Sequence, residues 1–214
     1  MSPMGGWLRQ LGDTGVTVSA VCVGGTPLGG VPENFGYDVA EEDAVSLVEA
    51  ILDSPIRFLD TANGYSNGRS EERIGKGIRA HGRLPDDFIV ANKVDAKGRD
   101  YSGKRVRASV RESKERLGLD SLPLVYLHDP EFHDFESMNA PGGAVETLFA
   151  LRNEGEIGHV GLAGGDVHEM SRYLARSPFE VVLVHNRWTL VDHSAGPMID
   201  QARERGAAVV NAAI

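Results

Sequence analysis

The stretch FLDTANGY, residues 58–65, joins an apolar run to two residues that carry chemistry. The run Ile56–Asp60 reads as a strand that stops on a carboxylate, and Tyr65 follows five residues later across a small polar turn. An isolated carboxylate in a buried position costs free energy unless a cation or hydrogen-bond donors accompany it. Asp60 and Tyr65 therefore predict a polar site where this strand ends.

Short apolar runs of this kind recur along the whole chain. They are rich in Val, Ile and Leu and are bounded by Gly, Pro, Asp or Asn, which is typical of strands. Their nearly continuous apolarity indicates strands that are covered on both faces, as in parallel sheets. The predicted strands are 17–25, 56–62, 88–94, 123–130, 159–165, 181–187 and 207–214.

Amphipathic stretches between these runs predict helices. In residues 70–82, Ser70 is the expected N-cap, because two acidic residues follow it in the first turn. In residues 103–118, Gly118 supplies a stop signal. The predicted helices are 41–53, 70–82, 103–118, 143–154, 166–176 and 194–205.

The alternation of strand and helix predicts a parallel α/β architecture. A doubly wound nucleotide-binding sheet would carry a glycine-rich turn leading directly into a helix. Residues 23–30, VGGTPLGG, lack the GxGxxG spacing, and the next predicted helix begins only near residue 41. We therefore expect a (β/α)₈ TIM barrel, with residues 1–214 forming a single domain. A typical barrel has about 250 residues, so the eighth strand and last helix are expected to be absent from this chain.

Composition excludes several classes of partner. The 214 residues carry a net charge of -9 and no basic stripe, which argues against nucleic-acid and anionic-membrane surfaces. Residues 1–10 lack a hydrophobic signal core. The lone Cys22 precludes an internal disulfide and is expected to be an inert core thiol in a reducing compartment. These features predict a cytoplasmic protein with a small-molecule substrate and leave the oligomeric state open.

In barrel enzymes the chemistry gathers at the carboxyl ends of the strands. There this chain places Asp60, Tyr65, Lys93 and His128. We expect Asp60 to pair with Lys93, whose ammonium group would favour the phenolate form of Tyr65 and assist acid/base catalysis. His128 could hydrogen-bond a substrate oxygen. This set suits proton transfer at a carbonyl or alcohol oxygen during hydride transfer at carbon, for which a nicotinamide is the expected hydride source.

The segment FLDTANGYSNGRSEERIGKGI resembles the signature of the aldo-keto reductase superfamily, and the four residues fall where that family keeps its catalytic tetrad. The resemblance continues through SVRESKERLGLDSLPLVYLHDPE and LRNEGEIGHVGLA and covers essentially the whole chain. Members of the family are (β/α)₈ barrels that bind NADP(H), less often NAD(H), and interconvert carbonyls and alcohols. The HDPE segment resembles the branch of aldose 1-dehydrogenases, L-fucose dehydrogenases and pyridoxal dehydrogenases.

The resemblance also implies cofactor contacts. Gly25 and Thr26 should approach the nicotinamide ribose and the pyrophosphate, and Asn186 should hold the carboxamide. Asn211 falls near the position of the residue that stacks on the nicotinamide ring, although an asparagine cannot stack as an aromatic residue does.

One departure from the family pattern lies in the strand 159–165. The usual Ser-Asn pair that also holds the carboxamide is replaced by Ala163 and Gly164. The resemblance implies that the residues that distinguish NADP from NAD lie beyond the strand 207–214, so both cofactors remain open.

Two further features have alternative interpretations. The segment HDPEFHDFE, residues 128–136, contains two histidines and four acids, but its spacing matches no ligand motif such as HExxH. We therefore predict an acidic solvated loop and no metal. Trp188 and His193 either line the substrate pocket or pack on a helix.

Two classes of function follow. The first is an NAD(P)-dependent oxidoreductase that interconverts an aldehyde, ketone or aldose lactol/lactone and its reduced form, with Tyr65 as general acid/base. The alternative is a non-catalytic cofactor-binding subunit on the same barrel, which the loss of the Ser-Asn pair would favour.

Overall fold

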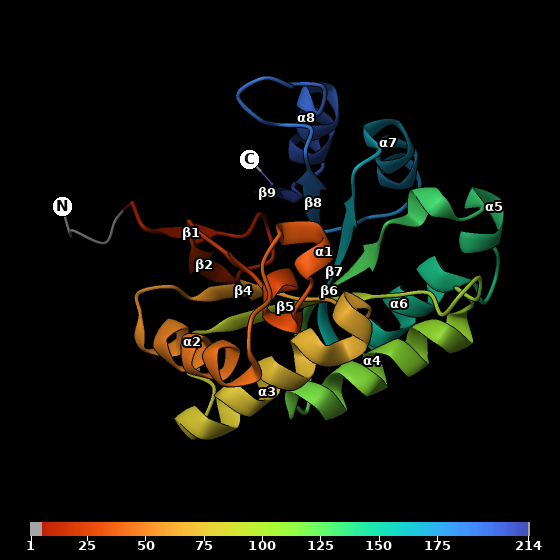
Figure 1. Ribbon diagram of the computed structural model, residues 1–214. Coiled ribbons are helices and arrows are strands. Elements are labelled where there is room, and N and C mark those ends of the chain that lie inside the picture. Colours follow the sequence, from red (N-terminus) through yellow and green to blue (C-terminus); the bar gives the residue numbers. More distant parts are fainter. Residues whose placement is uncertain (1–5, 214) are drawn as a thin grey trace.

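The computed structural model describes residues 6–213, in which a curled parallel sheet is surrounded by helices (Figure 1). Seven strands are hydrogen-bonded in chain order, each parallel to the next. They are β3 (Val23–Gly24), β4 (Phe58–Asp60), β5 (Ile89–Val94), β6 (Leu122–His128), β7 (Ile157–Gly164), β8 (Val181–His185) and β9 (Ala208–Ala212). Because every strand runs the same way, all their carboxyl ends meet at one edge of the sheet.

Helices connect successive strands and cover the outer side of the sheet (Figure 1). The longer ones are α2 (Glu41–Asp53), α3 (Arg69–His81), α4 (Gly103–Leu117), α6 (Ala144–Asn153), α7 (Val167–Arg176) and α8 (Gly196–Glu204). Short elements occupy the loops at the carboxyl edge: η1 (Thr26–Gly29), α1 (Pro32–Phe35), η2 (Tyr65–Gly68), η3 (Pro130–Phe132) and α5 (Phe135–Met138).

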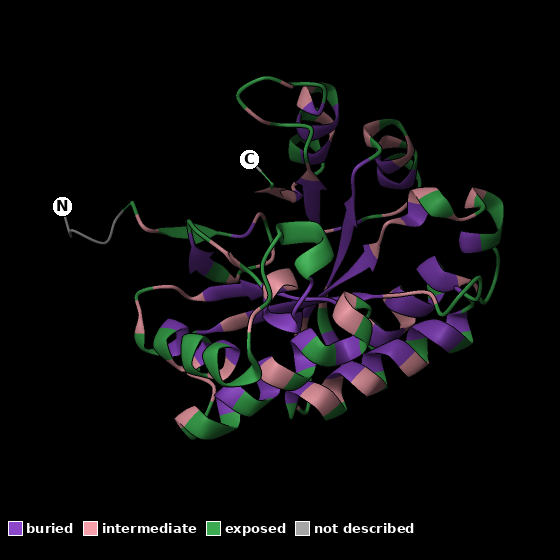
Figure 2. Cartoon of the chain, viewed as in Figure 1, coloured by how far each residue is buried: buried purple, intermediate pink, exposed green. Residues whose placement is uncertain are grey.

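Side chains alternate between the two faces of the sheet, as strand geometry requires. One face packs beneath the helices and forms the larger apolar cluster. The other faces the barrel interior and forms a second cluster, here called the inner cluster, of Leu11, Val18, Phe58, Ala91, Leu124, Tyr126, Ala163, Val181 and Leu183. Figure 2 shows most of strands β4–β8 and the sheet-facing sides of the helices as buried, whereas β9 is intermediate. The alternation then directs Asp60, Lys93, His128 and His185 toward the interior.

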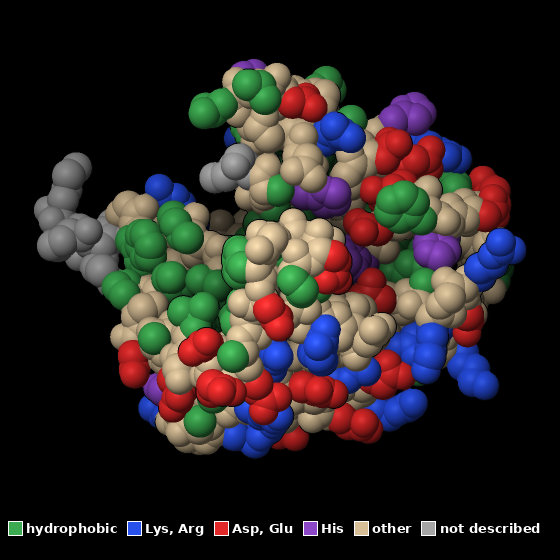
Figure 3. Space-filling view, in the orientation of Figure 1, with side chains coloured by type: hydrophobic (Ala, Val, Ile, Leu, Met, Phe, Trp, Pro, Cys, Tyr) green, Lys and Arg blue, Asp and Glu red, His purple; other side chains and the backbone are tan. Residues whose placement is uncertain are grey.

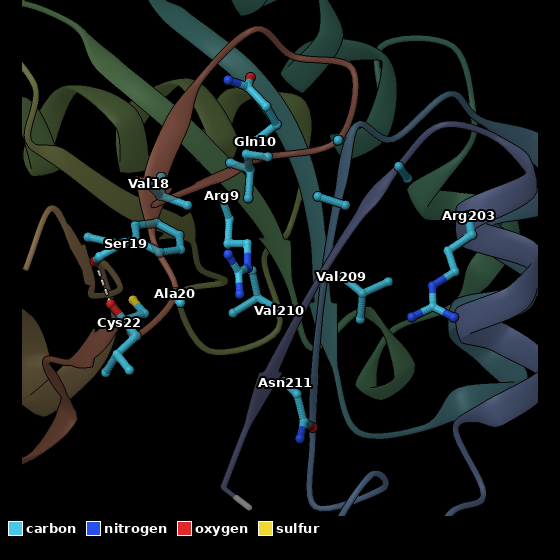
Figure 4. A pocket seen from close by; sticks show the side chains of 16 residues that line it. Arg9, Gln10, Val18, Ser19, Ala20, Cys22, Arg203, Val209, Val210 and Asn211 are labelled. Carbon is cyan, nitrogen blue, oxygen red and sulfur yellow. Dashed lines mark hydrogen bonds between the residues drawn. The ribbon is translucent and has the colours of Figure 1, made fainter. Parts of the chain in front are cut away.

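An N-terminal hairpin precedes the sheet and was not expected. It pairs β1 (Leu8–Gln10) with β2 (Thr17–Ser19) in antiparallel fashion. Between this hairpin and β9 lies a cleft of about 730 Å³, lined on one side by Arg9, Val18 and Cys22 and on the other by Val210 and Asn211 (Figure 4). Within residues 6–213 the strands β3 and β9 are the two edges of the sheet and do not pair with each other.

The fold-class prediction is confirmed, because a curled parallel sheet with outer helices is the arrangement of a (β/α)₈ barrel of which seven strands are present. None of the described helices combines the length and apolarity needed to cross a membrane.

Two local predictions were wrong. The strand expected at 17–25 is divided, because the Ser19 hydroxyl donates to the Val21 carbonyl (2.6 Å) and the chain bends before β3. Ser70 is not an N-cap, since α3 begins at Arg69. The Ser70 hydroxyl is buried and donates to the Gly25 carbonyl (2.7 Å), which fixes α3 against the end of β3.

The close contact between α3 and α4 depends on Gly75. A Cβ atom at this position would overlap the Arg116 carbonyl oxygen, which is backbone and cannot rotate away. We expect Gly75→Ala to lower the free energy of unfolding by about 1–3 kcal/mol, because the added methyl group overpacks a contact that is already tight. Chemical denaturation measures this. Gly196→Ala is the matched control, because its Cβ would meet only the edge of Trp188 at 3.5 Å; equal stability of the two variants would contradict the prediction.

Candidate active site

Lys93 lies at the centre of a polar cluster at the carboxyl edge of the sheet. Its side chain, on β5, is almost fully buried. The ammonium group forms an ion pair with the Asp60 carboxylate and donates to the Thr61 carbonyl at 2.9 Å and to the Tyr65 hydroxyl at 3.0 Å. Three acceptors therefore surround the three N–H donors of one cation.

The charge of Lys93 is maintained by its neighbours. Burial opposes the charged form, but the Asp60 carboxylate and the Tyr65 oxygen outweigh it and raise the pKa of Lys93 above its ordinary value. Lys93 is consequently an ammonium group throughout the physiological range. The second carboxylate oxygen of Asp60 is buried and has no hydrogen-bond partner among the described residues.

Tyr65 and His128 face each other across the cluster. Their ring centroids are 5.7 Å apart with an interplanar angle of 76°. Tyr65 begins η2, and the two residues after it have left-handed backbone angles, φ 51° at Ser66 and 56° at Asn67. The ring of Tyr65 lies against Lys93 on β5, with the Lys93 Nζ 4.6 Å from the ring centroid. The four residues that the sequence placed at the strand ends are thus together in the structure.

A buried polar network holds the segment between β4 and Tyr65. The amide group of Asn63 donates to the Ser109 carbonyl (3.2 Å) on α4, and Arg105 donates to its oxygen (3.2 Å). Arg105 also makes two hydrogen bonds to Glu112, which lower the pKa of Glu112 from 4.5 to about 2. The sequence pattern does not reveal this network, because the contacts of Asn63 with Arg105 and Ser109 span 42 and 46 positions.

Asp95, which no sequence pattern singles out, makes a second connection. It directly follows β5, and its carboxylate contacts two parts of the cluster. One oxygen lies 2.7 Å from Nδ1 of His128, and the other accepts the Gly64 amide proton at 2.6 Å. The Tyr101 hydroxyl fixes the His128 backbone by accepting from its N–H at 3.0 Å.

Of the predicted cofactor residues, Gly25 and Thr26 lie beside the cluster at the end of β3. The Gly25 amide donates to the Asp60 carbonyl at 2.7 Å. A Cβ atom at Gly25 would come within 2.8 Å of that carbonyl oxygen, so only glycine fits this approach of the chain to β4. Thr26 begins η1 and is half-buried.

The two predicted asparagines lie near the ends of β8 and β9. Asn186 lies one residue beyond β8, has a left-handed backbone (φ 61°) and is exposed. Asn211 is on the outer face of β9, where its amide donates to the Trp188 carbonyl at 2.7 Å. The inward-facing residues of these strands are His185 and Ala212. The structure therefore does not bring Asn211 together with the tetrad.

The end of β7 contains Ala163 and Gly164, as the sequence shows, and a neighbouring carboxylate occupies the space beside them. A Cβ atom at Gly164 would lie 2.6 Å from a Glu131 oxygen. Glu131 accepts hydrogen bonds from the amides of Gly165 (2.7 Å) and Asp166 (3.1 Å). Its other oxygen is buried and unpartnered within the described part of the chain.

Acidic and histidine side chains lie beside one another near the middle of the molecular surface shown in Figure 3. Ligand atoms of Asp129, Glu131 and His185 lie within 4.8 Å of one another, which is close enough for a cation. The spacing of HDPEFHDFE matches no linear ligand motif and therefore predicts no metal. Two of these groups do come from that segment, whereas the third comes from β8.

Trp188 and His193 contact each other, with ring centroids 4.9 Å apart, in the loop after β8. Trp188 is 40% exposed, and the neighbouring Leu190 and Val191 are almost fully exposed.

Cys22 lines the cleft beside β9, and burial raises the pKa of its thiol well above the ordinary value. A thiol in this environment remains protonated and is a poor nucleophile.

The aldo/keto reductase family model matches residues 20–214. This is most of the chain, and the curled parallel sheet agrees with it. The chain therefore belongs to the aldo/keto reductase family.

Individual relatives include enzymes named for sugars. The chain is 35% identical over 210 residues to L-galactose dehydrogenase of Arabidopsis thaliana, covering 96% of this chain and 64% of the relative. It is 28% identical over 227 residues to D-threo-aldose 1-dehydrogenase of Pseudomonas sp, covering 94% and 67%. The holo form of an aldo-keto reductase from Bacillus halodurans superposes with a TM-score of 0.78 at 26% identity, over 95% of this chain and 65% of that one. The chain thus spans about two thirds of the length of these relatives.

Proposed function

We propose that this protein is a nicotinamide-dependent oxidoreductase that interconverts a carbonyl group and an alcohol. The observation that carries the proposal is the contact of a buried, charged Lys93 with both the Asp60 carboxylate and the Tyr65 hydroxyl. A phenol held against an ammonium group in a site at the carboxyl edge of the sheet is suited to proton transfer at oxygen.

The protein residues have separate roles in the proposed reaction. In carbonyl reduction Tyr65 donates its hydroxyl proton to the carbonyl oxygen, and in alcohol oxidation its phenolate accepts the proton. Lys93 stabilises the phenolate, while Asp60 keeps Lys93 charged and in place. His128, across from Tyr65, forms a hydrogen bond with the same substrate oxygen and orients it.

A nicotinamide fits the groups at the ends of β6, β7 and β8. Within the described residues, one buried oxygen each of Glu131 and Asp129 has no hydrogen-bond partner, although the Asp129 oxygen lies 3.7 Å from the His185 Nε2, and such acceptors suit the N–H donors of a carboxamide. Gly25 and Thr26 remain the proposed contacts near the ribose and pyrophosphate, and Asn186 a proposed contact near the carboxamide. When bound, the cofactor supplies or accepts the hydride at the substrate carbon.

The relatives favour an aldose as the substrate. Two of them are named for dehydrogenation of L-galactose and of a D-threo-aldose. We therefore propose oxidation of a cyclic aldose at C1 as the physiological reaction, in which Tyr65 takes the proton of the hemiacetal hydroxyl.

Nucleotide titration followed by turnover tests the proposal. We expect the purified protein to enhance and shift the fluorescence of NADPH or NADH, and to reduce NADP⁺ or NAD⁺ on addition of L-galactose or a D-threo-aldose. The difference between the two nucleotides identifies the cofactor. Binding without turnover on any aldose or aldehyde would instead support a non-catalytic cofactor-binding subunit, and failure to bind either nucleotide would contradict both functions.

A further inference from the structure

Beyond the four proposed catalytic residues, Asp95 occupies a position that links two of them. Its carboxylate bridges Nδ1 of His128 (2.7 Å) and the amide of Gly64 (2.6 Å), the residue immediately before Tyr65. His128 is on β6 and Gly64 follows β4, while Asp95 follows the strand between them, β5. One side chain therefore connects the imidazole to the turn that carries the phenol.

The backbone of Asp95 is itself held firmly. Its amide donates to the Ser109 hydroxyl at 3.2 Å, and its carbonyl accepts from Arg105 at 3.2 Å. Both partners belong to α4, which is packed beneath the sheet. Gly64 is close enough that a Cβ atom there would lie 2.9 Å from the Asp95 carboxyl carbon. The bridge thus joins rigid elements and permits only glycine at position 64.

The chemistry of the bridge determines the state of the His128 ring. A carboxylate only accepts hydrogen bonds, so Nδ1 of His128 must carry a proton when it contacts Asp95. In the neutral ring, Nε2 is then the unprotonated nitrogen. It is the ring nitrogen that does not contact Asp95, and it lies 3.7 Å from an Asp129 carboxylate oxygen. The Asp95 carboxylate cannot turn without releasing the Gly64 amide.

We propose that Asp95 is a positioning residue for the oxidoreductase reaction: it sets the tautomer of His128 and fixes the imidazole relative to the Tyr65 phenol. The inference rests on the proposed function. Asp95 does not touch the reacting atoms, so it acts through His128 and through the turn at residues 63–65.

The variant Asp95→Asn tests the proposal because its amide has only one acceptor oxygen and cannot accept from both donors. By long-range ¹H–¹⁵N correlation at a pH where the ring is neutral, wild-type His128 is expected to be protonated at Nδ1. In Asp95→Asn either the proton moves to Nε2 or the Gly64 amide exchanges faster with solvent. We expect kcat to fall by about 10²-fold, because a small misplacement of reacting groups can slow a reaction to this extent. The nucleotide affinity should be unchanged.

Two further variants make the result decisive. In Gly64→Ala the added Cβ atom should displace the Asp95 carboxylate, and this variant should show the same loss of kcat. Asp87→Asn, which removes a largely exposed partner of Arg57, is the control for loss of one acidic charge. Melting curves confirm that each variant is folded.

The outcomes separate this inference from the proposed function. Tyr65-dependent turnover that is equally fast in Asp95→Asn would overturn the role of Asp95 alone, as would a wild-type His128 protonated at Nε2. Absence of turnover in the wild-type protein would overturn both, because no reaction would then exist for Asp95 to assist.

Discussion

Tyr65→Phe is expected to lower kcat for aldose oxidation by about 10²–10⁴-fold, the range that general acid/base groups contribute. The substitution removes only the hydroxyl that accepts a hydrogen bond from Lys93 at 3.0 Å. The aromatic ring that packs edge-on against His128 is retained. Nucleotide affinity should therefore change little, and the loss should fall on kcat.

Steady-state kinetics together with nucleotide titration measure this effect. Tyr37→Phe is the matched control, because Tyr37 is 55% exposed and lies outside the cluster. A Tyr65→Phe variant with wild-type kcat would show that the proton moves through another group. A variant that loses nucleotide binding to the same extent as turnover would show that Tyr65 acts in binding.

Lys93→Met is expected to have the second large effect, on stability as well as activity. The substitution leaves the Asp60 carboxylate buried without its cation, and breaking a buried pair in this way costs about 3–5 kcal/mol. Denaturant unfolding measures the loss. Activity should be abolished under conditions where the variant is still folded, because the Tyr65 phenolate would lose its stabilising charge.

An exposed lysine provides the comparison. Lys76 pairs with Glu41 at the surface, and Lys76→Met should cost far less stability than Lys93→Met, because an exposed ion pair is screened by solvent. Adding Asp60→Asn to Lys93→Met should recover part of the lost stability, because the unpaired charge is removed. If Lys93→Met were as stable as Lys76→Met, the buried ion pair would not be the support of the site that we describe.

The sequence was sufficient to predict the sheet and the central cluster because both depend on local patterns. Each of Asp60, Lys93 and His128 is a polar residue within or at the end of an apolar run, and parallel strands bring such ends together. Tyr65 follows its strand across a short turn of small residues, so its place near the cluster also follows from local sequence.

Other positions depended on details that local pattern does not contain. The face of β9 on which Asn211 lies could not be predicted, because side chains alternate between the faces of a strand and a shift of one residue exchanges inside for outside. Asn186 and His185 are adjacent in the sequence in the same way: His185 ends β8 and faces the interior, whereas Asn186 is exposed. Asp95 and Glu131 act through contacts that span 33 and 34 positions, and no spacing rule connects such distant residues.

Transfer of deuterium from a labelled cofactor is the most direct test of the proposed hydride chemistry. The protein would be incubated with an aldehyde or aldonolactone and NADPH or NADH carrying deuterium at C4, with each C4 epimer used in turn. We predict that one epimer delivers deuterium to the former carbonyl carbon of the product, detected by mass spectrometry and NMR. Product that contains no deuterium from either epimer, or no product in the presence of bound nucleotide, would contradict the proposed function.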